Sequence, residues 1–163
     1  MNFVLTPDHI EMVWRLLAAL FAGAAIGYER SYNGRPAGFR THALVCMSSS
    51  LLMLVTVYEA SWVRTSIEAT RLDPTRMAQG IMTGIGFLGA GAIIKEGLTV
   101  RGLTTAASIW ITAAIGVLAG IGFYFPLIVS VLLTLGVLYL WIGPPQAARS
   151  EAILLTAYCV SKD

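Results

Sequence analysis

Stretches without charge alternate with short charged segments along the chain, and they predict where it crosses a membrane. The stretches that lack Asp, Glu, Lys and Arg are 16–28, 41–58, 77–94 and 102–148. A charge at the centre of a membrane-spanning helix costs on the order of 2.5 to 3.5 kcal/mol on insertion scales, so such stretches mark spans. The last stretch would be roughly 70 Å long as one helix, against a hydrocarbon core of about 30 Å. It therefore holds two spans, and we expect five crossings in all.

Helix start and stop signals refine these boundaries. Thr6-Pro7 predicts that the first helix begins near Pro7, with Arg15 snorkelling toward the lipid headgroups. Asp73 is the expected N-cap of the third span, with Pro74 at its first position. Two glycines and a proline in 120–126 predict that spans four and five form a tight helical hairpin, and Gly143-Pro144-Pro145 ends the fifth.

Composition supports an all-α membrane protein and excludes other classes. Apolar residues make up 56% of the chain and charged residues 12%, whereas soluble domains carry about 25% charge. A net charge of +2 without any Lys/Arg run argues against nucleic acid as a partner. Asp8 and Glu11 precede the first apolar stretch where a signal peptide has basic residues, which favours an uncleaved helix.

Basic residues predict the orientation. With the amino terminus outside, more of them lie in cytosolic segments than outside, as the positive-inside rule requires. Those placed inside are Arg30, Arg35, Arg40, Lys95, Arg101, Arg149 and Lys162, and those outside are Arg15, Arg64, Arg71 and Arg76. We therefore expect a five-span transmembrane domain over 1–145 with its amino terminus outside, and a cytosolic tail over 146–163.

Glycines gather in the third predicted span, where 84–89 fits the GxGxxG pattern of dinucleotide-binding turns. That pattern needs a preceding strand and a helix that opens at the glycines, whereas here it lies inside an apolar span. Small residues at this spacing predict close helix packing instead, either within the chain or between copies, as they do in spans one and four. The glycines expected to pack are Gly80, Gly84, Gly86, Gly89, Gly91 and Gly102. The alternative is a broken third helix, as in transporters, with Gln79 and Thr83 lining a polar path.

Most other polar side chains lie in the two loops that this orientation places in the cytosol. Spans two and four begin there, and each helix start offers roughly half a positive charge and unpaired N–H donors. Arginines beside helix starts favour an anion as ligand. The candidate residues are Glu29, Arg30, Arg40, Thr41, Gln79, Thr83, Arg101, Thr104 and Thr105. The alternative is that the arginines only set topology and contact lipid phosphates, that Glu29 balances Arg40 or Arg101, and that His42 is a satisfied interfacial histidine.

Catalytic and metal-binding patterns are missing from the sequence. It has no nucleophile elbow, no His-Glu metal motif and no pair of acids within a span. Magnesium prefers carboxylates, and on the cytosolic side only Glu29 and Glu96 supply them. Cys46, which has only His42 near it, and Cys159 lack the further ligands that would complete a metal site. We therefore expect no enzyme, no cofactor and no resident metal ion.

Four motifs stand out once the spans are placed. They are Gly27-Tyr-Glu29-Arg30, Gly38-Phe-Arg40-Thr41-His42-Ala-Leu-Val45, Gln79-Gly-Ile-Met-Thr-Gly84-Ile-Gly86-Phe-Leu-Gly89-Ala-Gly91, and Val100-Arg101-Gly102-Leu-Thr104-Thr105-Ala106-Ala107 with Trp110. In combination, over about residues 12 to 142, they resemble the MgtC/SapB family of bacterial inner-membrane proteins. The resemblance implies a multi-pass protein of the bacterial plasma membrane, active in growth at low magnesium and in survival of pathogens inside macrophages.

The same resemblance implies how such a protein acts. Some members are thought to bind other membrane proteins, including ATP synthase, so a non-enzymatic role through membrane partners is the leading hypothesis. A transporter or channel for an ion or anion, with a broken third helix, is the alternative. Membrane lipids and a second copy of the chain, as a homodimer, are further expected partners. Longer members carry a carboxy-terminal domain that resembles an ACT fold, so the strand-like segment 151–160 is either the start of a truncated domain or a short tail.

Overall fold

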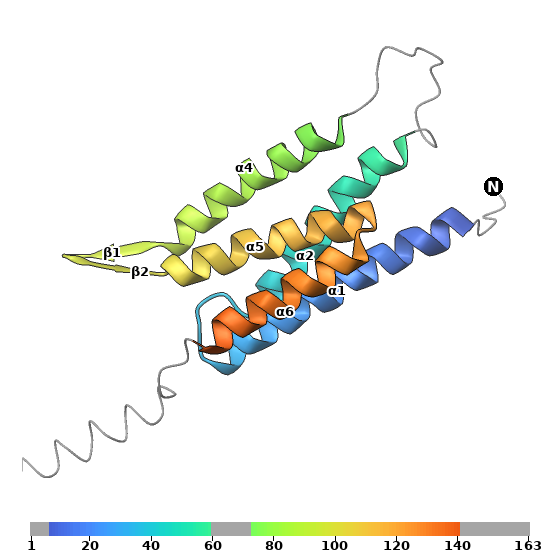
Figure 1. Cartoon of the computed structure of the whole chain (residues 1–163). Coiled ribbons are helices and arrows are strands. Elements are labelled where there is room, and N and C mark those ends of the chain that lie inside the picture. The colour runs from blue at the N-terminus through green and yellow to red at the C-terminus, as the bar shows by residue number, and fades with distance from the viewer. Residues whose placement is uncertain (1–6, 60–72, 141–163) are drawn as a thin grey trace, which may run out of the picture.

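Helices dominate the structure, a computed structural model that describes residues 7–59 and 73–140 (Figure 1). The helices are α1 (Pro7–Tyr32), α2 (Phe39–Val57), α4 (Pro74–Ala92), α5 (Leu103–Ile121) and α6 (Tyr124–Leu140). A short antiparallel hairpin of β1 (Ile94–Glu96) and β2 (Thr99–Arg101) joins α4 to α5. The helices lie roughly along one direction, with α4 at one side of the bundle (Figure 1).

Three helices have the length and apolar composition needed to cross a membrane: α1, α2 and α5. The shorter helix α6 is also apolar and has 17 residues. The mostly helical, membrane-type fold is therefore confirmed, while five crossings and the outer amino terminus stay predictions. The predicted tail over 146–163 lies outside the described residues.

The centre of the bundle is α2, which packs against α1 on one side and α5 on the other. Small residues let these backbones approach closely. A Cβ added at Gly23 of α1 would lie 2.5 Å from the His42 carbonyl oxygen, and one added at Gly120 of α5 would lie 2.6 Å from the Met53 Cβ. Ile26 and Ile115 are fully buried at this junction. The close packing predicted from the small residues of the first and fourth spans is confirmed.

The helix α4 begins where the sequence predicts. Asp73 is its N-cap and Pro74 its first residue, and the Asp73 carboxylate accepts hydrogen bonds from the backbone N–H and the hydroxyl of Thr75. These bonds lower the pKa of the Asp73 carboxyl. The helix then runs unbroken to Ala92 through all five of its glycines. The predicted alternative of a broken third helix is therefore wrong, because the backbone keeps its helical hydrogen bonds despite the low helix propensity of glycine.

Glycines shape both ends of α5. Gly102 precedes it with φ +88°, and a Cβ there would collide with the carbonyl oxygen of Ala92. Gly122 follows it with φ +89° and closes the helix through N–H bonds to Leu118 and Ala119. Since α6 begins only two residues later, the predicted tight hairpin is present, with Pro126 in the first turn of α6.

Candidate functional site

A column of buried polar side chains lies where α1, α2 and α5 meet. On α5, Thr105, Ser108 and Thr112 are three and four residues apart, so they share one face of the helix. Each is at most 3% exposed. Ser108 donates to the Thr105 carbonyl and Thr112 to the Ser108 carbonyl. Hydroxyls that satisfy themselves on their own helix are tolerated in an apolar bundle, so the column is stable without water.

His42 of α2 joins this column and is fully buried. Its Nδ1 lies 2.9 Å from the Gly38 carbonyl oxygen, and its Nε2 lies 3.0 Å from the Ser108 hydroxyl. Because a carbonyl only accepts, Nδ1 carries a proton, and in the neutral ring Nε2 accepts from the Ser108 hydroxyl, whose one proton lies within reach of both Nε2 and the Thr105 carbonyl. The histidine therefore ties the start of α2 to α5, which confirms the interpretation of His42 as a satisfied side chain.

Arg30 lies at the same end of the column and is only 3% exposed. Its Nη2 donates to the Thr105 hydroxyl over 3.1 Å, but its Nε has no hydrogen-bond partner. Among the described residues, no carboxylate oxygen lies within 4.0 Å of its guanidinium. The Glu29 carboxylate acts on this guanidinium only as a nearby opposite charge without a hydrogen bond, so the cost of burying Arg30 is partly compensated. We call this part of the bundle the Arg30 end.

Next to Arg30, the Glu29 carboxylate is half satisfied. Asn33 donates to its Oε1 over 2.7 Å, whereas the buried Oε2 has no partner. Both side chains line a pocket of about 300 Å³ between α1, α5 and α6. The full lining is Glu29, Arg30, Asn33, Arg35, Thr104, Val137 and Leu138. One end of this pocket is polar and charged, and the residues from α6 form an apolar wall.

Arg15, at the opposite end of α1, shows how a buried arginine is normally compensated. It pairs with Glu11, and its Nη1 donates to the Gly120 carbonyl oxygen over 2.9 Å. Its guanidinium also lies over the ring of Tyr58 at 5.3 Å. The expected snorkelling of Arg15 is wrong, because its side chain turns inward to the carbonyl end of α5, where a positive charge is favourable.

The remaining predicted site residues do not gather at this pocket. Arg40 is exposed, and Arg101 is exposed and lies 3.8 Å from Glu96. Neither one meets Glu29, so the expected balancing of Glu29 by Arg40 or Arg101 is not seen. Thr41 lines a different pocket, between α2, α4 and α5, which Thr105 also reaches. Of the nine candidates, only Glu29, Arg30 and Thr104 share the pocket, with Thr105 bonded to Arg30 behind it.

The open face of α4 is defined here as Gln79, Gly80, Thr83, Gly84, Gly86, Phe87 and Gly91, and at its edge Phe87 and Gly91 also line the pocket between α2, α4 and α5. All seven residues are exposed. Thr83 donates to the Gln79 carbonyl on its own helix, so these two residues do not line a polar path within the chain. A Cβ added at any of the four glycines would meet no atom of the described residues within 4 Å. Within residues 7–59 and 73–140 these glycines therefore pack against no other helix, so packing between copies stays a prediction, whereas a Cβ at Gly89 would lie 3.7 Å from the Ala106 Cβ of α5.

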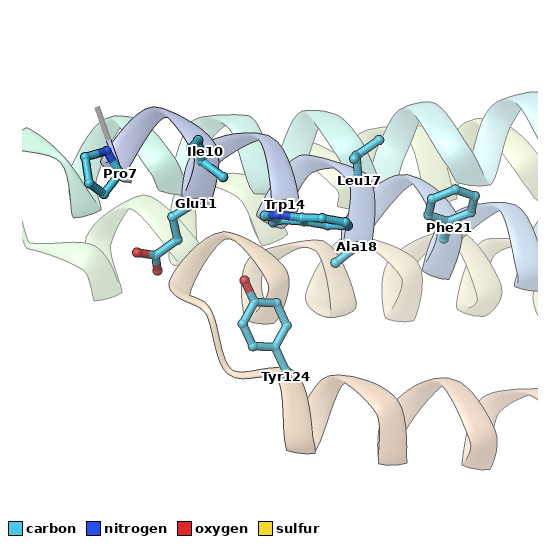
Figure 2. Close-up of a pocket in the computed structure, with 8 residues that line it drawn as sticks. All are labelled: Pro7, Ile10, Glu11, Trp14, Leu17, Ala18, Phe21 and Tyr124. Atoms are coloured by element: carbon cyan, nitrogen blue, oxygen red, sulfur yellow. The ribbon is translucent and has the colours of Figure 1, made fainter. Parts of the chain in front are cut away.

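A second pocket, of about 620 Å³, lies between α1 and the start of α6 (Figure 2). Its walls are mostly apolar, and Tyr124 extends from α6 toward the α1 residues Trp14 and Glu11 (Figure 2). The Glu11 carboxylate is already paired with Arg15. In the described residues, no group of three or more His, Cys, Asp or Glu side chains could hold a metal ion.

Several residues of the Arg30 pocket were missing from the candidates. Asn33 and Arg35 follow Arg30 closely, and their position in the same loop was a usable signal. Val137 and Leu138 come from more than a hundred residues away, and nothing in the apolar pattern of α6 marks them. The column on α5 could have been found from the spacing of Thr105, Ser108 and Thr112 alone.

Comparison with known proteins agrees with the sequence motifs. The model of the MgtC family matches residues 16–142. A protein of Escherichia coli strain K12 named "Putative magnesium transporter YhiD" is 47% identical over 114 residues, which cover 70% of this chain and 53% of that protein. "Protein MgtC" of Salmonella typhimurium strain LT2 is 46% identical over 110 residues, covering 68% of this chain and 43% of that protein.

An uncharacterized protein of Haemophilus influenzae is 38% identical over 130 residues, which cover 79% of this chain and 55% of that protein. The chain thus spans about half the length of the curated relatives it matches. No solved structure gives a significant match. Since the family model covers most of the chain and includes every motif quoted above, this protein belongs to the MgtC family.

Proposed function

We propose that this chain supports growth at low magnesium from the bacterial plasma membrane, and that it acts without catalysis by docking another membrane protein on the open face of α4. The observation that carries the proposal is the contrast between two sets of glycines. Those of α1 and α5 face α2 at less than van der Waals distance, while four on α4 face no atom of the described chain. Close approach of a second helix is what such faces permit in a membrane.

The exposed aromatic ring of Phe87 adds a contact for the partner. It is 82% exposed and, by helical periodicity, lies in line with Gly80, Gly84 and Gly91. A large side chain beside a row of small ones offers both a protrusion and a groove to a transmembrane helix. Membrane subunits of ATP synthase are the first partners to test, because the family resemblance implies them.

Transport of magnesium through the bundle is the competing function, suggested by the printed name of the Escherichia coli relative. The charged residues classed as buried in the described bundle are Arg15 and Arg30, which would repel a divalent cation, and a single buried carboxylate oxygen, that of Glu29, stands against them. The transport hypothesis also depended on a broken third helix, and α4 is continuous. Flux of Mg²⁺ into liposomes that hold the purified chain would favour this alternative.

Photocross-linking in magnesium-starved bacteria tests the docking proposal. A photoreactive residue replaces Phe87 on α4, and the matched control replaces Leu133 on α6, which is also largely exposed. We expect Phe87 to capture a membrane protein and Leu133 to capture only lipid. Adding Gly84→Leu should abolish the capture, while Gly136→Leu, which also fills open space, should not. Capture of lipid alone at both positions would contradict docking. Capture of a second copy of the chain would mean that the open face of α4 forms a homodimer.

A further inference from the structure

The second inference concerns the Arg30 pocket and is independent of the open face of α4. Two arginines, Arg30 and Arg35, and one carboxylate, Glu29, line this pocket. Its charge is therefore net positive before any ligand binds. Arg15, on the same helix, has a carboxylate, a carbonyl oxygen and an aromatic ring as partners, whereas Arg30 has one hydroxyl. Arg15 is paired directly with a carboxylate, whereas Arg30 has Glu29 only as a nearby charge that it does not contact.

The start of α5 adds donors to the same pocket. Gly102 is its N-cap and has no side chain, so no side-chain oxygen accepts the first N–H groups of the helix. Thr104, in the first turn, lines the pocket. A helix N-terminus attracts anions through its dipole and its free N–H groups. Together with the unpartnered Nε of Arg30, it presents donors to an oxyanion from two elements.

The unpartnered Oε2 of Glu29 restricts the ligand further. A carboxylate oxygen only accepts hydrogen bonds, so the ligand must carry a donor as well as a negative charge. The glycerol hydroxyls of phosphatidylglycerol meet this need, and so does a protonated oxygen of inorganic phosphate. A halide ion or a fully deprotonated anion does not.

Two α6 residues form the apolar wall of the pocket. Val137 is 67% exposed, whereas Leu138 is partly buried and packs against the core of the bundle, so the outer part of the wall is Val137. An amphiphile fits a pocket that is positively charged at one end and apolar at the other. Its charged headgroup would lie in the pocket beside Arg30, and its acyl chains would lie against α6. We propose that the Arg30 pocket binds a phosphate group, supplied by an anionic phospholipid headgroup or by free phosphate.

Native mass spectrometry of the full chain, purified from an equal mixture of phosphatidylglycerol and phosphatidylcholine, tests the lipid source. We expect phosphatidylglycerol to be retained in preference. Arg30→Gln should weaken its binding about tenfold or more, since it removes a charge-assisted bond. Arg30 is buried and its variant can fail to fold, so Arg35→Gln is the second variant, with an expected loss of about two- to fivefold. Arg101→Gln removes the same charge from an exposed residue just before α5 and should leave binding unchanged.

Titration of inorganic phosphate into the chain held in phosphatidylcholine nanodiscs tests whether the pocket binds free phosphate. Chloride is the control anion. Saturable phosphate binding that Arg35→Gln weakens, without preference for phosphatidylglycerol, would assign the pocket to free phosphate. Preference for the lipid with no phosphate binding would assign it to the headgroup. The proposal is overturned if neither probe binds, or if Arg101→Gln weakens binding as much as Arg35→Gln does.

Discussion

Alanine at Gly23 should destabilise the bundle, whereas alanine at Gly84 should not. At Gly23 the new Cβ would lie 2.5 Å from the His42 carbonyl oxygen and 2.7 Å from the Cys46 Cβ. Both atoms are fixed to the backbone of α2, so neither can rotate away and the helices must move apart. At Gly84 no atom of the residues that the structure describes lies within 4 Å of the new methyl group.

The size of the difference follows from two terms. Overpacking costs about 1 to 3 kcal/mol, and contact with backbone atoms places Gly23→Ala in the upper half of that range. Alanine gains about 0.8 to 1.0 kcal/mol over glycine in a helix at either position. We therefore expect Gly23→Ala to lower the free energy of unfolding by about 1 to 2 kcal/mol and Gly84→Ala to raise it by up to about 1 kcal/mol.

Equilibrium unfolding in mixed detergent micelles, followed by circular dichroism, measures both variants against the parent chain. Equal effects of the two substitutions would refute the packing argument, as would a larger loss at Gly84. The first result would mean that Gly23 and Gly84 are packed alike, and the second that Gly84 is packed more tightly than Gly23.

Two further predictions concern polar groups. His42→Leu removes two side-chain hydrogen bonds, one to the Gly38 carbonyl and one to the Ser108 hydroxyl, each worth about 0.5 to 1.5 kcal/mol. The free energy of unfolding should therefore fall by about 1 to 3 kcal/mol, and a loss below about 0.5 kcal/mol would contradict the view that His42 links α2 to α5. Because its hydrogen bonds lower the pKa of Asp73 below the usual 3.8, the cap stabilises α4 fully above that pH and is lost as the pH falls through the lowered native pKa. Amide protection at the start of α4 should fall in this acidic range, but not in Asp73→Asn.

Much of the fold could be predicted from the sequence because it depends on local signals. Asp73 and Pro74 mark a helix start by their own backbone chemistry, and Gly122 ends α5 through a conformation that favours glycine. The short β-hairpin before α5 was not predicted. Its strands have three residues each and are fully exposed, so no alternation of apolar and polar positions marks them.

The direction in which a small residue faces could not be predicted from spacing. Gly23 and Gly84 occur in the same kind of pattern, yet one lies against α2 and the other against nothing in the described chain. That difference depends on how α4 sits in the bundle, which is a tertiary property. The inward turn of Arg15 has the same origin, because its carbonyl partner at Gly120 is distant in sequence.

The candidate site was predicted in part for similar reasons. Glu29, Arg30 and Thr104 meet in one pocket because spans one and four both have an end there. Arg40 and Arg101 were included because they are charged, lie beside helix starts and belong to the quoted motifs, and both are exposed. Sequence identifies which residues carry charge, but burial decides which charge needs a partner.

Growth at low magnesium tests the central claim most directly. Bacteria that lack the native gene would carry the parent chain, Gly84→Leu or Gly136→Leu at equal membrane levels. Both substitutions place the same side chain in open space, one on α4 and one on α6. The account predicts that Gly84→Leu loses growth support while Gly136→Leu keeps it. Full growth with Gly84→Leu would contradict docking on the open face of α4.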